Sequence, residues 1–343
     1  MTNRWLFRVN VANERETGEI KKARGTGHAM KCLSLATTAK QYGANVHFSV
    51  EGDDDIKRLF ENHGVSHTIT SNHKSVIRDF DPDIIVIDIN YADVDVVTEY
   101  RANAVVVNLA PRGSCKYYAD YSFNSARIED TPEPDDSSLK KWYAGPEYAI
   151  LNPAFVSLRI DIDHSEFVPE RNGVIVQMGG VDQDNITKTV VEKLDFDLFA
   201  DKVFTIVAGP FNPHIEELKS KCRGHENISF LQDPDDFEQI VANHKLGIFG
   251  SGISTYEAMA VGVPSINLGL SSFHDYRGEY LEKVELGYYL GRYDQVDQSI
   301  INDTVQLLLS DEEELNQLRE RAMKAVDGHA CDRIVSTLWS VPI

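Results

Sequence analysis

The sequence predicts an α/β protein built from two doubly wound domains. Its 343 residues suit two domains rather than one or four, because a domain holds roughly 150 residues. Short apolar runs, typical of strands buried on both faces, alternate with segments that suit helices. A polar stretch near the middle interrupts this alternation, which then starts again. We therefore expect two similar sheets in tandem rather than one large sheet.

The first half starts with a short strand and a long connection. Residues 5–9 suit a strand, whereas residues 10–24 are polar and charged without a clear period, so we expect a loop there. A helix is predicted to begin near His28 and to end at Gly43. The remaining elements predicted for this half are strands at residues 45–50, 83–89 and 104–108 and a helix at residues 56–62.

The boundary between the two domains is expected in the polar segment at residues 161–172, directly before a new strand. The predicted domains are residues 1–165 and 166–343, with a last helix that can return to the first domain. Strands of the second half are predicted at residues 173–178, 203–208, 228–231, 246–249 and 265–268, and a last helix at residues 312–326.

The charge balance excludes some partners. Lys and Arg number 34 against 54 Asp and Glu, which gives a formal net charge of −20. Such a chain repels a nucleic-acid backbone at long range, so no nucleic-acid partner is expected, and an anionic ligand must be held by local groups.

Cysteine and histidine spacing favours neither disulfides nor metal. The four cysteines lie far apart without a CxxC pair, and no HExxH motif occurs among the histidines. No apolar run reaches the length of about 18 residues that a membrane span requires, so we expect no membrane insertion and a cytoplasmic location. The oligomeric state is not written in any motif.

Glycine pairs follow three predicted strands and mark the expected ligand edge of each sheet. The loop after the first strand reaches Gly25 and Gly27. In the second half, Gly179 and Gly180 follow one strand and the turn Gly250–Gly252 follows another, at the carboxyl ends where doubly wound domains bind ligands. Free N–H groups at the start of the helix after Gly252 can bind a diphosphate. A capping box of Ser254 and Glu257 is an equally good explanation of the same residues.

His28 is the candidate general base. It directly follows Gly27 at the predicted start of a helix, where the dipole favours the neutral imidazole that accepts a proton. The alternative is a histidine that only bonds its own loop. A dinucleotide fingerprint with Glu51 as the ribose acid fits poorly, because Met30 stands at the third glycine position. Neither a GxSxG elbow nor a GxxxxGK[ST] loop occurs.

The segment RGTGHAMKCLSLA (residues 24–36) resembles the glycine, histidine and basic-residue segment of the UDP-sugar hydrolases of pseudaminic acid biosynthesis, the PseG/SpsG-like family. Lys31 stands where that family usually has arginine. Further matches follow in order along most of the chain: DYSFN with Asn124, GPEYAILNP (145–153), GGVDQDNIT (179–187) and GSGISTYEAMAVGVP (250–264).

The resemblance implies two Rossmann-like domains with a central cleft, the GT-B type, and release of UDP from a UDP-linked N-acetylated amino sugar without metal or cofactor. It makes His28 the base that activates water, and gives the diphosphate to Ser251 and Gly252, the ribose to Glu257 and the uracil to the region of Phe230 and Leu231. The full set implied for the nucleotide is Gly27, Gly179, Gly180, Phe230, Leu231, Gly250, Ser251, Gly252, Ile253, Ser254 and Glu257, and for the sugar Asn124, Asp182, Asn185 and His274.

Three departures from the family and three rival functions stay open. The segment at residues 10–24 is longer than the family's, His274 stands where relatives often carry glutamine, and residues 108–111 replace an aspartate-rich turn. The sugar is therefore not fixed. A GT-B glycosyltransferase would use the same base on a hydroxyl acceptor, although the chain shows no clustered basic run beyond residues 21–24 for docking on a membrane. A non-catalytic nucleotide-sugar sensor and an NAD enzyme are the other two alternatives.

Overall fold

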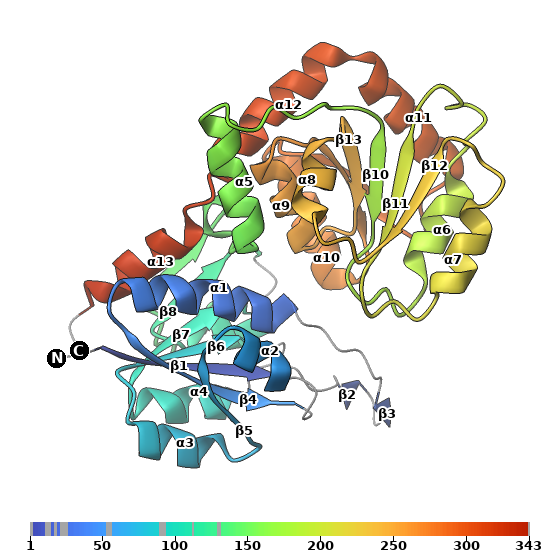
Figure 1. The fold of residues 1–343 in the computed structure, drawn as a ribbon. Coiled ribbons are helices and arrows are strands. Elements are labelled where there is room, and N and C mark those ends of the chain that lie inside the picture. The colour runs from blue at the N-terminus through green and yellow to red at the C-terminus, as the bar shows by residue number, and fades with distance from the viewer. Residues whose placement is uncertain are drawn as a thin grey trace. The chain divides into compact units, whose positions relative to one another are not determined.

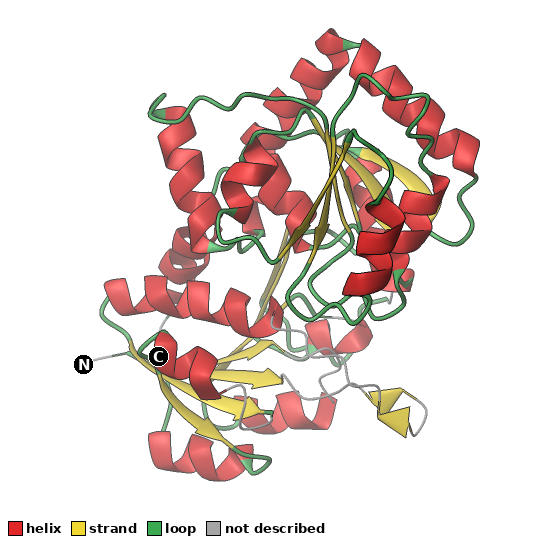
Figure 2. Ribbon diagram, turned by 45° about the vertical axis from the view of Figure 1, so that its right-hand side comes forward, coloured by secondary structure: helices red, strands yellow, loops and turns green. Residues whose placement is uncertain are grey.

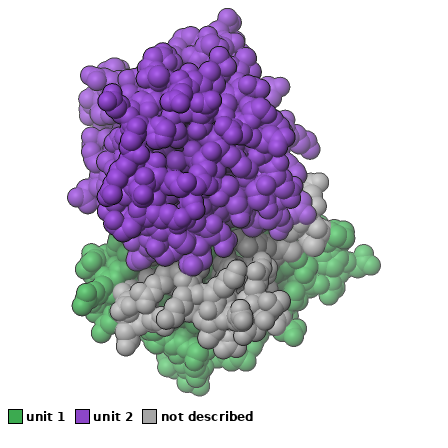
Figure 3. Space-filling view, turned by 90° about the vertical axis from the view of Figure 1, so that its right-hand side faces the viewer, with its two compact units in different colours: residues 1–152, 329–343 green, residues 153–328 purple. Residues whose placement is uncertain are grey.

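The computed structural model describes residues 3–10, 15–16, 19–20, 27–52, 57–88, 94–111, 113–128 and 132–341. The chain forms two compact units, which Figure 3 colours separately. The first unit contains residues 1–152 and 329–343, and the second contains residues 153–328. Each unit is a parallel sheet with helices packed against it (Figures 1 and 2).

In the described residues, the first unit has a seven-stranded sheet in the order β5-β4-β1-β6-β7-β8-β9, with every pairing parallel. The chain moves outward in one direction from β1 through β4 to β5 and in the other from β6 to β9, so the order reverses between β1 and β6. Ligands of open parallel sheets bind beyond the strand ends at such a switch point. The strands are β1 (Arg4–Asn10), β4 (Asn45–Glu51), β5 (Ser66–Ile69), β6 (Ile84–Asp88), β7 (Val105–Leu109), β8 (Tyr121–Asn124) and β9 (Lys141–Ala144).

Helices cover both faces of this sheet because the strand side chains alternate between two apolar clusters. Phe7 and Val9 of β1 point to the cluster beneath α1 and α13, whereas Leu6 points to the cluster beneath α3 and α4. The helices of this unit are α1 (Gly27–Gln41), α2 (Lys57–Asn62), α3 (His73–Phe80), α4 (Val94–Arg101) and α13 (Ala330–Trp339), with short 3-10 turns at Gly113–Tyr117 and Pro146–Tyr148.

The second unit, fully described, has a six-stranded parallel sheet in the order β12-β11-β10-β13-β14-β15, with its switch point between β10 and β13. Its strands are β10 (Val174–Gln177), β11 (Phe204–Ala208), β12 (Ile228–Gln232), β13 (Leu246–Phe249), β14 (Ser265–Gly269) and β15 (Tyr288–Arg292). Its helices are α5 (Pro153–Asp163), α6 (Ile186–Lys193), α7 (Ile215–Cys222), α8 (Phe237–Ala242), α9 (Ile253–Ala260), α10 (Ser272–Lys283), α11 (Gln298–Ser310) and α12 (Glu312–Ala325).

The structure contains elements that the sequence analysis did not predict, among them β5, β8, β9, β15, α3 and α4. It also differs from the expectation in three other places. The expected loop at residues 10–24 contains two short antiparallel strands, β2 (Arg15–Glu16) and β3 (Glu19–Ile20). The units divide before Pro153 rather than after residue 165. The reason is α5, whose Phe155 and Leu158 pack into the second unit's core with residues of α8 and α9. Finally, α13 follows α12 as a separate helix and packs in the core of the first unit.

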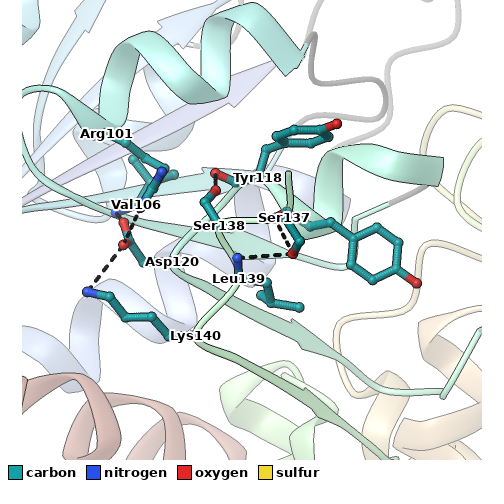
Figure 4. A network of polar contacts seen from close by, with 9 residues as sticks. Arg101, Val106, Tyr118, Asp120, Ser137, Ser138, Leu139 and Lys140 are labelled. Atoms are coloured by element: carbon teal, nitrogen blue, oxygen red, sulfur yellow. Dashed lines mark hydrogen bonds and ion pairs between the residues drawn. The ribbon is translucent and has the colours of Figure 1, made fainter. Parts of the chain in front are cut away.

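A polar network fixes the segment before β9 to the rest of the first unit (Figure 4). Asp120 accepts hydrogen bonds from Arg101 and from the Val106 N–H, and Lys140 Nζ lies 3.3 Å from the same carboxylate. Burial alone would raise the pKa of Asp120, but these donors outweigh it, so the pKa lies below the usual value. The hydroxyls of Ser137 and Ser138 donate to main-chain carbonyls of the 117–118 region. These bonds therefore hold residues 137–140 in place where they lead into β9.

Candidate active site and nucleotide-binding turn

The first unit carries a histidine–aspartate pair at its switch point. Asp88 is the last residue of β6 and only 1% of its side chain is exposed. His28, in the first turn of α1, places Nδ1 2.8 Å from Asp88 Oδ1. Lys31 Nζ lies 2.9 Å from the other oxygen, and Cys32 Sγ donates to that oxygen at 3.6 Å. Residues 28, 31 and 32 share one face of α1, so one helix supplies three partners to one carboxylate.

The charges around Asp88 favour its ionised form. Burial alone would raise the pKa of Asp88, but Lys31 first and then His28 outweigh it, and the pKa lies below the usual value. Burial raises the pKa of the Cys32 thiol well above its usual range, so Cys32 stays a protonated donor. With the carboxylate ionised, His28 donates from Nδ1, and the neutral form of the ring then has Nε2 as its acceptor. The His28 side chain is 28% exposed, which leaves the ring accessible to solvent.

Asn124 lies at the same edge of the sheet, where the strands end, but away from the His28–Asp88 pair. It ends β8 and is buried, and its Oδ1 accepts a hydrogen bond from the Ala126 N–H at 3.3 Å. Because β7 separates β8 from β6, the two strand ends are about 10 Å apart. The predicted contact of Asn124 with a sugar stays a prediction, as does that of Gly27, which begins α1.

Glu51, the acid of the dinucleotide alternative, is engaged by an arginine. Its Oε2 lies 2.6 Å from Arg8 Nη2, and His73 Nε2 lies 3.7 Å from the same oxygen. Arg8 is buried in β1 beside it. This carboxylate is engaged in an ion pair within the first unit, which argues against the ribose role that the dinucleotide alternative would give it.

In the second unit, the turn Gly250–Gly252 joins β13 to α9. Gly252 is the N-cap of α9 and makes no side-chain cap hydrogen bond. Ser254 lies inside the first turn, so the Ser254–Glu257 capping box is not formed and that explanation of the motif is wrong. The N–H groups of a first helical turn have no partners within the helix. Ser254 is half-buried and Ile253 is 36% exposed, so this helix start is accessible in the unit itself, whereas Glu257 is buried.

Ser251 contributes main chain rather than a hydroxyl to the turn. Its side chain is fully buried, and Oγ donates to the Leu268 carbonyl at 3.1 Å. Its φ is 51°, in the left-handed region that favours glycine. The sequence-based prediction that Ser251 holds a diphosphate therefore concerns its backbone.

The second glycine pair lies at the same edge of the same sheet. β10 pairs with β13 with Gln177 opposite Phe249, so Gly179 and Gly180 follow one strand and the Gly250–Gly252 turn follows its neighbour. A side chain at Gly209, after β11, would come within 2.4 Å of the Gly180 backbone. The loops after β10 and β11 thus pack main chain against main chain beside the switch point.

The other predicted ligand residues of this unit are more dispersed. Phe230 and Leu231 lie on edge strand β12, three strand spacings or about 14 Å from β13, and pack toward opposite faces. His274 lies in the first turn of α10, with Nδ1 2.8 Å from Ser271 Oγ. Their predicted contacts with uracil and sugar stay predictions.

Asp182 and Asn185 have structural partners at the start of α6. The Asp182 carboxylate accepts hydrogen bonds from the N–H groups of Ile186 at 2.6 Å and Thr187 at 2.9 Å. Asn185 donates to Glu217 at 2.8 Å. Their sugar contacts also stay predictions, and for Asp182 any such contact must share a carboxylate that already caps a helix.

Sequence reasoning missed Asp88, and with it the partner of His28. The available signal was an acidic residue at the end of an otherwise apolar run, together with polar residues spaced i, i+3 and i+4 from His28. Among the described residues, no group of three or more His, Cys, Asp or Glu side chains could hold a metal ion, and no helix is long and apolar enough to cross a membrane.

Comparisons with known proteins agree with this architecture. No protein-family model matches the chain. The chain is homologous to the spore coat polysaccharide biosynthesis protein SpsG of Bacillus subtilis, with 23% identity over 254 residues, covering 71% of this chain and 74% of that protein. An uncharacterized protein of Methanocaldococcus jannaschii is 24% identical over 275 residues, which cover 76% of this chain but only 56% of that protein.

Solved structures show the fold class. MurG of Acinetobacter baumannii matches with a TM-score of 0.65 and 12% identity, covering 99% of this chain and 100% of that one. The UDP-GlcNAc 2-epimerase of Neisseria meningitidis, bound to UDP-GlcNAc, matches with a TM-score of 0.64 and 13% identity, again over 99% and 100% of the chains. The chain therefore has the GT-B fold of two Rossmann-like units, each a parallel sheet flanked by helices.

Proposed function

We propose that this chain is a nucleotide-sugar hydrolase that releases UDP from a UDP-linked N-acetylated amino sugar, with His28 as the general base. The observation that carries the proposal is the 2.8 Å pair between His28 and the buried Asp88 at the switch point of the first sheet. A carboxylate on Nδ1 both orients an imidazole and stabilises the cation formed when Nε2 accepts a proton. Homology to SpsG, named for polysaccharide biosynthesis, supports carbohydrate chemistry.

The proposed reaction needs one base and one site for the leaving group. His28 Nε2 takes a proton from water while the water oxygen bonds to the anomeric carbon. The bond from that carbon to the diphosphate oxygen breaks, and its electron pair leaves with UDP. The products are free sugar and UDP, and the protonated imidazole is stabilised by Asp88. In this scheme the imidazole, and no metal ion or cofactor, activates the water.

The second unit is proposed to bind the nucleotide at the Gly250–Gly252 turn. The start of α9, whose N-cap is a glycine, offers N–H groups and the positive end of a helix dipole, which suit a diphosphate on a chain of net charge −20. UDP-GlcNAc bound to the epimerase of the same fold supports a UDP-sugar as ligand. All four cysteines lie in the described residues as free thiols, which supports a reducing cytoplasm.

The test is UDP release from a panel of UDP-linked N-acetylated amino sugars, with mass spectrometry of the sugar product. We compare the wild type with His28→Asn and with the matched control His47→Asn. His47 is also a hydrogen-bonded histidine of the first unit, but its partners are Ser66 and Thr68 of β5. His28→Asn should lower kcat by about 10²- to 10⁴-fold, the usual contribution of a general base, and leave UDP affinity unchanged.

The other outcomes separate the rival functions. UDP release that requires an added hydroxyl acceptor would replace the hydrolase with a glycosyltransferase. UDP binding without release from any sugar, with or without acceptor, would leave a nucleotide-sugar sensor. Equal activity of wild type and His28→Asn would refute the role of His28.

A further inference from the structure

The Gly250–Gly252 turn adopts a backbone conformation that needs support from outside. Ser251 has a Cβ and still lies at a φ of 51°, in the left-handed region that is unfavourable for an L-residue. Conformations of this kind persist only where the surroundings fix them, and they gather at functional sites. One support is the Ser251 hydroxyl, which bonds the Leu268 carbonyl. The carbonyl of Ser251 requires a second support.

Arg277 of α10 supplies that second support. Its Nη1 donates to the Ser251 carbonyl oxygen at 3.5 Å, and only 9% of the residue is exposed. The guanidinium carbon lies 4.6 Å from the ring centre of Phe273 and 5.8 Å from that of Tyr256, a buried residue of α9. Stacking on two rings limits the rotamers of the arginine and directs its fork toward the turn.

We infer that Arg277 is a positioning residue of the nucleotide site: by holding the Ser251 carbonyl, it fixes the turn so that the N–H groups at the start of α9 face the phosphates of UDP. The inference rests on the proposed function for the identity of the ligand. It goes further by naming a residue that touches no phosphate itself and yet sets the affinity for phosphate. It also predicts that the affinity for the nucleoside part of the ligand does not depend on Arg277.

The experiment measures the affinity of the full chain for UDP and for uridine by NMR titration. The variants are Arg277→Met, Arg277→Lys and a matched control, Arg171→Met. Arg171 also donates to main-chain carbonyls of the second unit, including Val261 at the opposite end of α9. Thermal unfolding of each variant provides the comparison of stability.

Arg277→Met should weaken UDP binding by about 10- to 100-fold, the loss expected for a charge-assisted hydrogen bond, and leave uridine affinity unchanged. Arg277→Lys keeps the charge but loses the planar fork, so it should recover only part of the UDP affinity. Arg171→Met should lower the Tm without changing the affinity for either ligand.

Three results would overturn the inference. The first is unchanged UDP affinity in Arg277→Met, and the second is an equal loss of UDP and uridine affinity in that variant. The third is full UDP affinity in Arg277→Lys, because the charge of Arg277 alone would then explain its effect. UDP binding by the wild type without hydrolysis of any UDP-sugar would refute the proposed hydrolase and leave this inference standing. No UDP binding by the wild type would refute both.

Discussion

Replacing Asp88 with asparagine tests the core of the candidate active site with little change of shape. Asparagine keeps the volume of the side chain but has no charge, and one of its two terminal atoms donates rather than accepts. The buried group could then no longer accept hydrogen bonds from both His28 at 2.8 Å and Lys31 at 2.9 Å. His28 would lose the partner that fixes its orientation and stabilises its protonated form.

The expected loss of stability in Asp88→Asn follows from the burial of Asp88 and of its two partners. Leaving one partner of a fully buried ion pair unpaired costs about 3–5 kcal/mol. Here the side chains of Lys31 and His28 are 17% and 28% exposed, so water compensates in part, and we expect about 1–3 kcal/mol of lost unfolding free energy. For catalysis we expect a fall in kcat of about 10²- to 10⁴-fold, because the imidazole can no longer act as an oriented base.

The dependence on pH has a definite sign. The folded-state pKa of Asp88 lies below its usual value, so its ion pairs stabilise the protein fully above the unfolded carboxyl pKa, about 3.9. The stabilisation is lost as the pH falls through the lowered folded-state pKa. The gap in unfolding free energy between wild type and Asp88→Asn should therefore close in acid.

Two assays check this prediction. Urea unfolding measures the free energy of unfolding at neutral and acidic pH, and UDP release measures kcat. Because Asp88 and His28 act as one unit, the double variant Asp88→Asn/His28→Asn should be no slower than His28→Asn alone. A kcat for Asp88→Asn within about threefold of the wild type, or fully additive losses in the double variant, would refute the reasoning.

Three further predictions follow from single side chains. Lys31→Arg should keep the ion pair with Asp88 and nearly all of the activity, whereas Lys31→Met should lower kcat by about tenfold and leave UDP affinity unchanged. Equal kcat values for the two variants would contradict this prediction. Asp120→Asn should cost about 1–2 kcal/mol of unfolding free energy at neutral pH, measured in urea; because the folded pKa of Asp120 is lowered, the cost should vanish as the pH falls through it. Asp182→Ala should lower the free energy of unfolding by about 1–2 kcal/mol, because it removes the cap of α6. A rise in the KM for the UDP-sugar with no change in the free energy of unfolding would show a sugar contact instead.

The sequence predicted much of the fold because both sheets are parallel and buried on both faces. Continuous apolar runs such as residues 84–87 and 246–249 are visible without any alignment. Several of the strands that were missed have a weaker signal. β5 and β15 are half-buried, and β9 follows an acidic segment whose position depends on the long-range bonds of Asp120. No local pattern encodes such bonds.

The candidate site was predicted in part for a related reason. His28 and the Gly250–Gly252 turn can be identified from sequence because glycines and helix-start signals lie next to each other in the chain. Asp88 is 60 residues away from His28, and only the pairing of β1 with β6 brings their segments together. Arg277 is likewise separated by 26 residues from Ser251, whose carbonyl it holds. Residues that act through others are the hardest to find from sequence, because their partners are defined by topology.

The return of the chain to the first unit has a consequence for the order in which the protein is made. Ile334 and Leu338 of α13 lie in the same apolar cluster as Ala29 and Leu33 of α1, the helix that carries His28, and Figure 1 shows the two helices side by side. During translation the second unit is complete after residue 328, whereas the first still lacks a part of its core. The ribosome must therefore release the whole second unit and then α13 before α1 gains its last support. Until then, the nascent chain can hold a folded second unit while the core beneath α1 is still incomplete.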